Sequence, residues 1–293
     1  MSELFFPQII MNYEIIRIIF AVIGTSIAAY FDIFNKKNIP DLLLYSFLIL
    51  SLIIVIVDYN PILLLYSFGG AAIIGLIGYI FYRLGQLGGA DVFILCSLAL
   101  LLPIQPTLFS EKPLIPLPFI FSIILVSGLT FMIYVLIKYT PLVLKRKEKI
   151  DKKRILYSLG LVIIFLVFLY LYTKIPVISE YYLILMGFLI FVSIYFSIFK
   201  ERLMGSLIEK LPLSKIEAED VIAIEYMKKE IVKKYNIPRV VSEKDLKRLK
   251  KFKINKYPVY TKLPMFVPFI LLGLLISIYF GDMLYILAAT SVF

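Results

Sequence analysis

The chain has 293 residues, of which 61% are hydrophobic and 17% charged, with a net charge of +11. This balance excludes a water-soluble globular protein, because so large an apolar share cannot be hidden from water. The sequence holds no histidine and a single cysteine, Cys96. HExxH zinc sites, serine–histidine catalysis, tetracysteine modules and intrachain disulfides are therefore excluded as well. We attribute the positive charge to loops beside anionic lipid and expect no nucleic-acid partner.

Eight apolar stretches approach the roughly 20 residues that a helix needs to cross about 30 Å of hydrocarbon. The first stretch lacks the basic segment that precedes a cleavable signal peptide, so we interpret it as a retained helix. The sequence predicts an all-α polytopic membrane protein with about eight transmembrane helices and a small α or α+β module between the last two. The predicted spans cover residues 13–31, 42–57, 62–82, 91–104, 114–137, 155–173, 181–199 and 264–281.

The distribution of lysine and arginine predicts the orientation of these spans in the cell membrane. With the N-terminus outside, the 31 basic residues all fall on the cytoplasmic side except Arg17, Lys112 and Lys174. Both termini then lie outside in this multi-pass arrangement. We expect anionic membrane lipids to be partners of the basic cytoplasmic loops.

The spans and loops divide the chain into four predicted parts. Residues 1–137 form a transmembrane core of five spans, and 138–199 form a basic cytoplasmic loop with two additional spans. Residues 200–263 form a basic cytoplasmic module, and 264–293 carry the final span.

Within the polar module, two helices are predicted. Residues 217–235 place apolar side chains at helical spacing, with acids first and lysines last, which suits the helix dipole. Ser242 and Asp245 resemble a capping box that opens a second, short basic helix. A solvated basic module held near anionic lipid needs no further function, so that interpretation stays open.

Two aspartates lie at the edges of predicted spans. Asp32 closes the first span in AAYFDIFNKKNIPD, and Asp91 opens the fourth in LGQLGGADVFIL. The predicted orientation places both on the cytoplasmic side. Acidic side chains at such positions are costly and indicate function. Simpler explanations exist for each, because Asp91 suits a helix N-cap and Asp32 could reach the interface.

Three features favour a joint role for the two acids. Asp32 continues a stripe of small residues with Gly24 and Ala28, which predicts that it faces the helix bundle. The third span is rich in glycine, and the fourth has roughly 14 residues that reach only about 21 Å. Asp91 is therefore expected to be recessed from the lipid surface. Two carboxylates that converge there would share a proton, one acting as base towards water and the other as acid towards a carbonyl.

These motifs resemble those of prepilin peptidases. FDIFNKKNIPD is similar to the first conserved block of that family, and GGAD is similar to the second, a Gly-x-Gly-Asp variant. LPLSKIEAEDVIA and KLPMFVPFILLG resemble late segments of archaeal preflagellin and prepilin peptidases. The resemblance implies an intramembrane aspartyl endopeptidase of the GxGD type. Such enzymes remove the short basic leader, a class III signal peptide, from type IV pilin-like or archaellin precursors at the cytoplasmic membrane face.

The resemblance also implies roles for individual residues. It makes Asp32 and Asp91 the catalytic pair. The supporting motif residues are Gly88, Gly89, Ala90, Asn38, Ile39, Pro40 and Asp41. The candidate contacts for a basic leader are Asp41, Glu217, Glu219 and Asp220, although a first-turn acid at a helix start explains these four equally well.

The chain also departs from the family pattern. The tetracysteine segment of bacterial members is missing, so we expect no methyltransferase activity, and neither a metal nor a cofactor is expected. The small archaeal members have about six spans, so the additional spans near 155–199 leave the preferred precursor open.

Three alternatives remain. Presenilin-like and signal-peptide-peptidase-like proteases also use an aspartate pair with a Gly-x-Gly-Asp motif, but their Pro-Ala-Leu element is missing here. A transporter could use Asp32 and Asp91 as proton or cation ligands, although no inverted repeat is visible. A membrane scaffold that binds lipid or partner chains would not depend on either aspartate.

Overall fold

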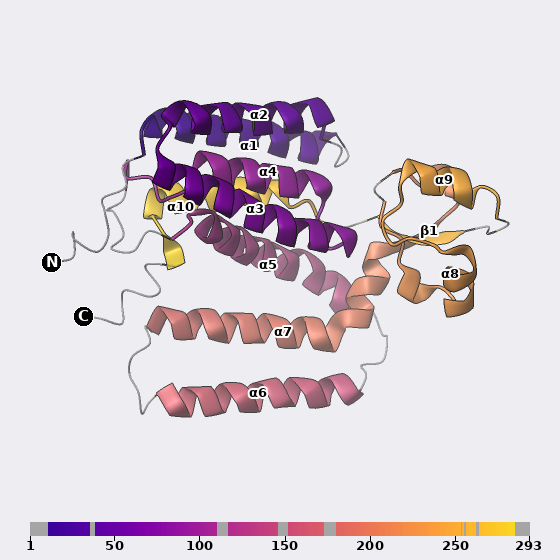
Figure 1. The fold of residues 1–293 in the computed structure, drawn as a ribbon. Coiled ribbons are helices and arrows are strands. Elements are labelled where there is room, and N and C mark those ends of the chain that lie inside the picture. The colour runs from indigo at the N-terminus through magenta and orange to yellow at the C-terminus, as the bar shows by residue number, and fades with distance from the viewer. Residues whose placement is uncertain are drawn as a thin grey trace.

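The computed structural model describes residues 11–35, 39–109, 117–145, 152–172, 180–218, 220–252, 254, 256–261 and 264–284. This part of the chain is a helical membrane protein (Figure 1). The long or apolar helices are α1 (Glu14–Phe34), α2 (Asp41–Asp58), α3 (Pro61–Arg83), α4 (Gly89–Leu101), α5 (Ile120–Lys145), α6 (Lys152–Tyr172), α7 (Glu180–Leu207) and α10 (Val267–Phe280). Each overlaps one predicted span. Among the described residues six are long and apolar enough to cross a membrane, while α4 and α10 are shorter.

Most helix boundaries differ by a few residues from those predicted. Helix α4 starts two residues before Asp91 and ends at Leu101, because Pro103 follows and disfavours helical backbone in the residue before it. Helix α5 begins at Ile120 and continues to Lys145 with Pro141 inside it. Helix α7 extends to Leu207, beyond the predicted end at 199, so polar residues of the predicted module belong to a helix that leaves the apolar region.

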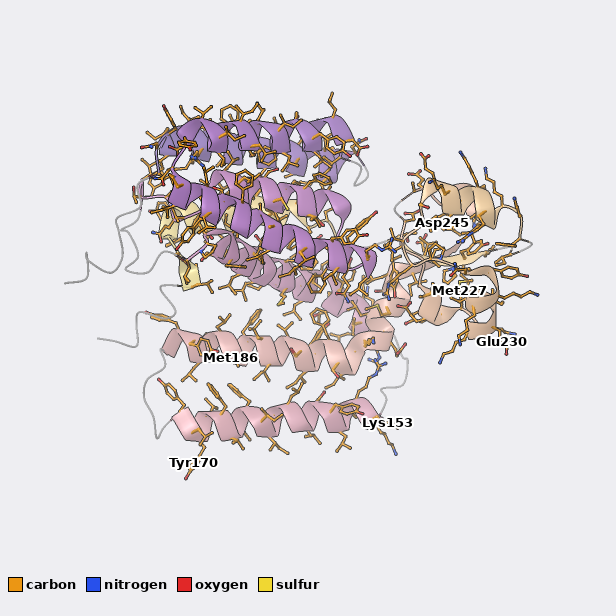
Figure 2. The ribbon with its side chains drawn as sticks, viewed as in Figure 1. Lys153, Tyr170, Met186, Met227, Glu230 and Asp245 are labelled. Carbon is orange, nitrogen blue, oxygen red and sulfur yellow. The ribbon has the colours of Figure 1, made fainter. Side chains whose placement is uncertain are left out.

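Helices α1 to α5 and α10 form one bundle, and α7 and α6 lie beside it (Figure 1). Helix α4 contacts α1, α2 and α3, and α10 packs between α1 and α5. Helix α6 contacts α7 and buries very few of its residues, and Figure 2 shows its Tyr170 pointing away from the bundle. Exposed apolar side chains on these helices suit contact with lipid.

Small residues bring the bundle helices close together, as the glycine pattern predicts. Gly24 of α1 faces the ring of Phe47 on α2, which fills the space that a side chain at position 24 would need. A Cβ at Gly78 of α3 would lie 2.8 Å from Cγ1 of Val92 on α4. Small residues at such positions let helix backbones approach in a membrane, where packing drives association.

A small α+β module lies between α7 and α10. Strand β1 (Ile208–Leu211) pairs antiparallel with β2 (Tyr257–Tyr260), with Ile208 opposite Tyr260. The other elements are the 3₁₀ turns η2 (Leu213–Lys215) and η3 (Ile224–Tyr226) and the helices α8 (Lys229–Tyr235) and α9 (Glu243–Leu249). The module has its own apolar core, whose buried residues are Ile216, Ile222, Ile237, Val241, Leu249, Tyr257 and Val259.

The prediction of one helix over 217–235 is wrong, because among the described residues of this segment only Lys229–Tyr235 are α-helical. Val221 and Ile222 instead form isolated bridges with Val240 and Val259. Both are β-branched, and pairing with segments further along the chain satisfies their backbone groups better than a local helix does. The predicted capping box is confirmed: the N–H of Asp245 donates to the Ser242 hydroxyl, and the N–H of Ser242 donates to the Asp245 carboxylate, each at 3.2 Å.

Candidate active site

A buried ion pair fixes which helix ends lie together. The Arg17 guanidinium, near the start of α1, contacts the Asp58 carboxylate at the end of α2 at 2.8 Å. It also donates to the carbonyl of Leu101, the last residue of α4, at 2.9 Å. The opposite ends of these three helices therefore also lie together, and they carry Asp32, Asp41 and Asp91. Figure 1 shows this end of the bundle next to the module.

Asp32 lies in the last turn of α1, and its residue is only 6% exposed. Ala28, one turn before it, is fully buried, so the stripe of small residues faces the bundle interior. This agrees with the interpretation that Asp32 points into the protein and not towards lipid.

Asp91 is the third residue of α4 and is 8% exposed. It is not an N-cap, since Gly88 occupies that position with extended backbone angles. The N–H of Gly88 donates to Oδ2 of Asp91 at 2.9 Å. The carboxylate is thus held at the positive end of a helix dipole by a backbone donor.

The first glycine of the GGAD motif has a direct structural explanation. A Cβ on Gly88 would lie 3.0 Å from Oδ2 of Asp91, so a side chain there would press on the carboxylate. Gly89 begins α4, and Ala90 packs against the buried core of the bundle. The motif therefore lets the chain pass close to the carboxylate that it holds.

The carboxylates of Asp32 and Asp91 interact electrostatically. Two buried acids that interact in this way do not ionise independently, because a second negative charge is unfavourable in a medium of low dielectric constant. A pair that shares one proton can activate a water molecule and protonate a carbonyl oxygen.

The remaining predicted site residues lie in different surroundings. Ile39 is buried, Pro40 precedes α2, and Asp41 is the exposed first residue of α2 at the same end as Asp91. In the module, Glu217 is exposed, and its N–H donates to the Asp220 carboxylate at 2.9 Å. Asn38 and Glu219 lie outside the described residues.

Sequence reasoning did not identify a contact between the module and the turn before GGAD. Gly85, six residues before Asp91, lies against Val221 and Arg239 of the module. This contact brings the segment that holds Glu217 and Asp220 towards the same end of the bundle. Gly85 has φ +65°, a conformation that favours glycine. The glycines of the LGQLGG turn are therefore the sequence signal that could have indicated such a close approach.

Sequence reasoning also missed two buried polar clusters at the far end of the bundle. The first joins Arg17 and Asp58, and Asn12 donates to the same carboxylate at 2.7 Å. In the second, the Ser122 hydroxyl donates to Asp282, whose N–H donates to the Gln105 side chain at 2.8 Å. An arginine inside an apolar run is the signal that could have found the first, because such charges are usually paired.

One protein family is similar to the part of the chain that holds both aspartates. The model of the type IV leader peptidase family matches residues 19–136, from α1 into α5. No curated protein and no solved structure matches the chain. Over residues 19–136, which include Asp32 and Asp91, the chain is similar to the type IV leader peptidase family.

Proposed function

We propose that this protein is an intramembrane aspartyl endopeptidase that uses Asp32 and Asp91. Its substrates are type IV pilin-like or archaellin precursors, from which it removes the short basic leader at the cytoplasmic membrane face. The observation that carries this proposal is the burial of two interacting carboxylates at one end of the bundle, inside the family match.

The surroundings of the two acids support different roles for them. Asp91 lies at the N-terminus of α4 and accepts the Gly88 N–H, and both features favour a negative charge. Asp32 lies in the last turn of α1, where the helix dipole disfavours a negative charge. We therefore assign the shared proton to Asp32 and the charge to Asp91 in the resting enzyme.

These roles give a balanced hydrolysis. The Asp91 carboxylate takes a proton from water while the water oxygen forms a bond to the scissile carbonyl carbon. Asp32 gives its proton to the carbonyl oxygen, which produces a neutral gem-diol. The reverse proton movements then break the C–N bond: Asp32 takes a proton from a gem-diol hydroxyl, and Asp91 protonates the leaving amine. Both acids regain their starting states, and no metal or cofactor takes part.

The positive-inside rule supports the cytoplasmic location of this chemistry. In the predicted orientation the basic loops and the module share the side of Asp32 and Asp91, and a precursor leader carries its basic residues on that side before an apolar helix. Asp41 and Asp220 are candidates to attract such a leader. The family match favours a leader peptidase over a presenilin-like protease, a transporter or a scaffold.

Co-expression with a pilin-like precursor tests the proposal. We expect the wild-type chain to shorten the precursor, and Asp32→Asn and Asp91→Asn each to lower the rate by at least about a thousandfold. Glu230→Gln is the matched control, because Glu230 lies on α8 and Figure 2 shows it pointing outwards from the module. Cleavage at the wild-type rate by either aspartate variant would refute the catalytic pair.

A further inference from the structure

The turn between α3 and α4 is closed by a defined set of backbone hydrogen bonds. The N–H of Gly85 donates to the carbonyl of Tyr82 at 2.8 Å, and the N–H of Gln86 donates to that of Phe81 at 2.9 Å. This pair of bonds is a Schellman motif, in which the residue after the helix has left-handed angles. Gly85 has φ +65° and occupies that position. The turn therefore ends α3 and leads directly to Gly88, which holds Asp91.

The module fills the space where a side chain of Gly85 would lie. A Cβ there would be 3.0 Å from Cγ1 of Val221 and 3.4 Å from Nε of Arg239. The residue after Val221 is joined to Arg239 through the backbone, since the N–H of Ile222 donates to the carbonyl of Arg239 at 2.7 Å. A movement of the turn thus requires a movement of the module or the loss of this packing.

The Arg239 side chain is itself held in place. Its guanidinium contacts Oε1 of Glu225 at 3.2 Å, and the hydroxyl of Tyr260 donates to the same oxygen at 2.9 Å. Burial raises the pKa of Tyr260, and its hydrogen bond to Glu225 raises that pKa further. The Tyr260 hydroxyl therefore stays protonated at physiological pH and continues to donate.

The module is also fixed to the two outer helices. The Glu201 carboxylate of α7 contacts the Arg154 guanidinium of α6 at 2.5 Å and accepts from the Tyr226 hydroxyl at 3.2 Å. Burial raises the pKa of Tyr226 to about 12, and the neighbouring Glu201 contributes in the same direction. The turn before Asp91 thus packs against a body that is anchored elsewhere in the protein.

We propose that Val221 and Arg239 are positioning residues for Asp91. By packing on Gly85 they fix the turn that sets the N-terminus of α4, and hence the place of the carboxylate relative to Asp32. The effect on cleavage rests on the proposed peptidase function, whereas the effect on the turn does not.

Steady-state kinetics of the detergent-solubilised full chain, with a synthetic peptide that carries a basic leader, tests the role of Arg239. We expect Arg239→Ala to lower kcat on the order of tenfold and to leave KM unchanged. Arg239→Lys keeps the aliphatic stem and the charge, so it should recover part of the loss. Arg248→Ala is the matched control: Arg248 pairs with Asp245 at 2.8 Å and has similar exposure, 39% against 35% for Arg239. A change in KM alone would assign Arg239 to leader binding and overturn the proposal.

A double-mutant cycle tests the contact with Val221. Gly85→Ala should lower kcat, because the new Cβ meets Val221 and the backbone angle is unfavourable for alanine. Val221→Ala removes the obstructing methyl group, so the double variant should regain at least about threefold relative to the product of the single effects. Gly85→Ala combined with Arg248→Ala should be multiplicative. Multiplicative effects in both pairs would refute the coupling.

Amide hydrogen exchange gives a readout that does not depend on cleavage. Arg239→Ala should speed exchange over residues 84–91 by about tenfold, while Arg248→Ala and Asp32→Asn should not. If the aspartate variants abolish cleavage but Arg239→Ala leaves both exchange and kcat unchanged, the positioning role is wrong and the peptidase stands. If the wild-type chain cleaves no precursor while exchange responds as expected, the proposed function fails and the hold on the turn stands.

Discussion

The two ends of the helix bundle both bury aspartates, but they surround them differently. At one end, Asp58 meets the guanidinium of Arg17, and both side chains are 1% exposed. At the other end, the Asp91 carboxylate accepts a backbone N–H and interacts electrostatically with a second acid, Asp32. Both arrangements lie at the ends of the same three helices.

We expect this difference to separate a structural site from a reactive one. A buried carboxylate that is matched by a cation is stable as it stands, and removing one partner exposes the other to the full cost of burial. A buried pair of acids is costly in the folded protein and becomes useful only when it exchanges protons. Three substitutions test whether the two ends differ in this way.

The largest effect on stability is expected from Arg17→Ala. This change leaves Asp58 buried without its cation and removes the donor to the Leu101 carbonyl. We expect the free energy of unfolding in detergent to fall by about 3–5 kcal/mol. Denaturant titration followed by circular dichroism measures the change, with the exposed Arg83→Ala as control. A loss of less than about 1 kcal/mol would remove the contrast between the two ends.

A smaller effect is expected from Gly78→Ala, at the aspartate end of α3. The added methyl group would lie 2.8 Å from Val92, the residue after Asp91. Overpacking of this kind lowers the free energy of unfolding by about 1–3 kcal/mol, and we expect cleavage to fall with it. Gly69→Ala on the same helix is the control, because nothing lies within 4 Å of its Cβ. Equal behaviour of the two variants would show that α3 and α4 do not pack as described.

The smallest change in stability is expected from Asp91→Asn, the variant that should abolish cleavage. The amide oxygen of asparagine can still accept the Gly88 N–H, and the interaction between two acids is removed. We expect the free energy of unfolding to stay the same or to rise by up to about 1 kcal/mol. The same titration decides the outcome. A loss above about 2 kcal/mol would make Asp91 a structural cap and not a reactive acid.

Much of the fold follows from local patterns in the sequence. The eight apolar helices, the stripe that ends at Asp32 and the capping box at Ser242 each depend on residues close together in the chain. The family motifs single out Asp32 and Asp91, which lie 59 residues apart in the sequence and which no spacing rule could pair.

What the sequence did not reveal depends on contacts between distant segments. Residues 217–228 have helical spacing, yet Val221 and Ile222 pair with Val240 and Val259 further along the chain. The partner of Arg17 is 41 residues away, and Gly85 meets a module more than 130 residues downstream. Local preference is overridden at each of these places by tertiary packing.

Helix α4 has 13 residues and takes part in the polar contacts at both ends of the bundle. Its last carbonyl binds the Arg17 guanidinium, and its first turn presents Asp91. Both its length of about 20 Å and its rotation about its own axis are therefore fixed. Inserting one residue would rotate everything on one side of it by about 100°. Such a change would either turn Asp91 away from Asp32 or pull Leu101 from Arg17, so this short helix tolerates substitutions on its faces far better than any change of register.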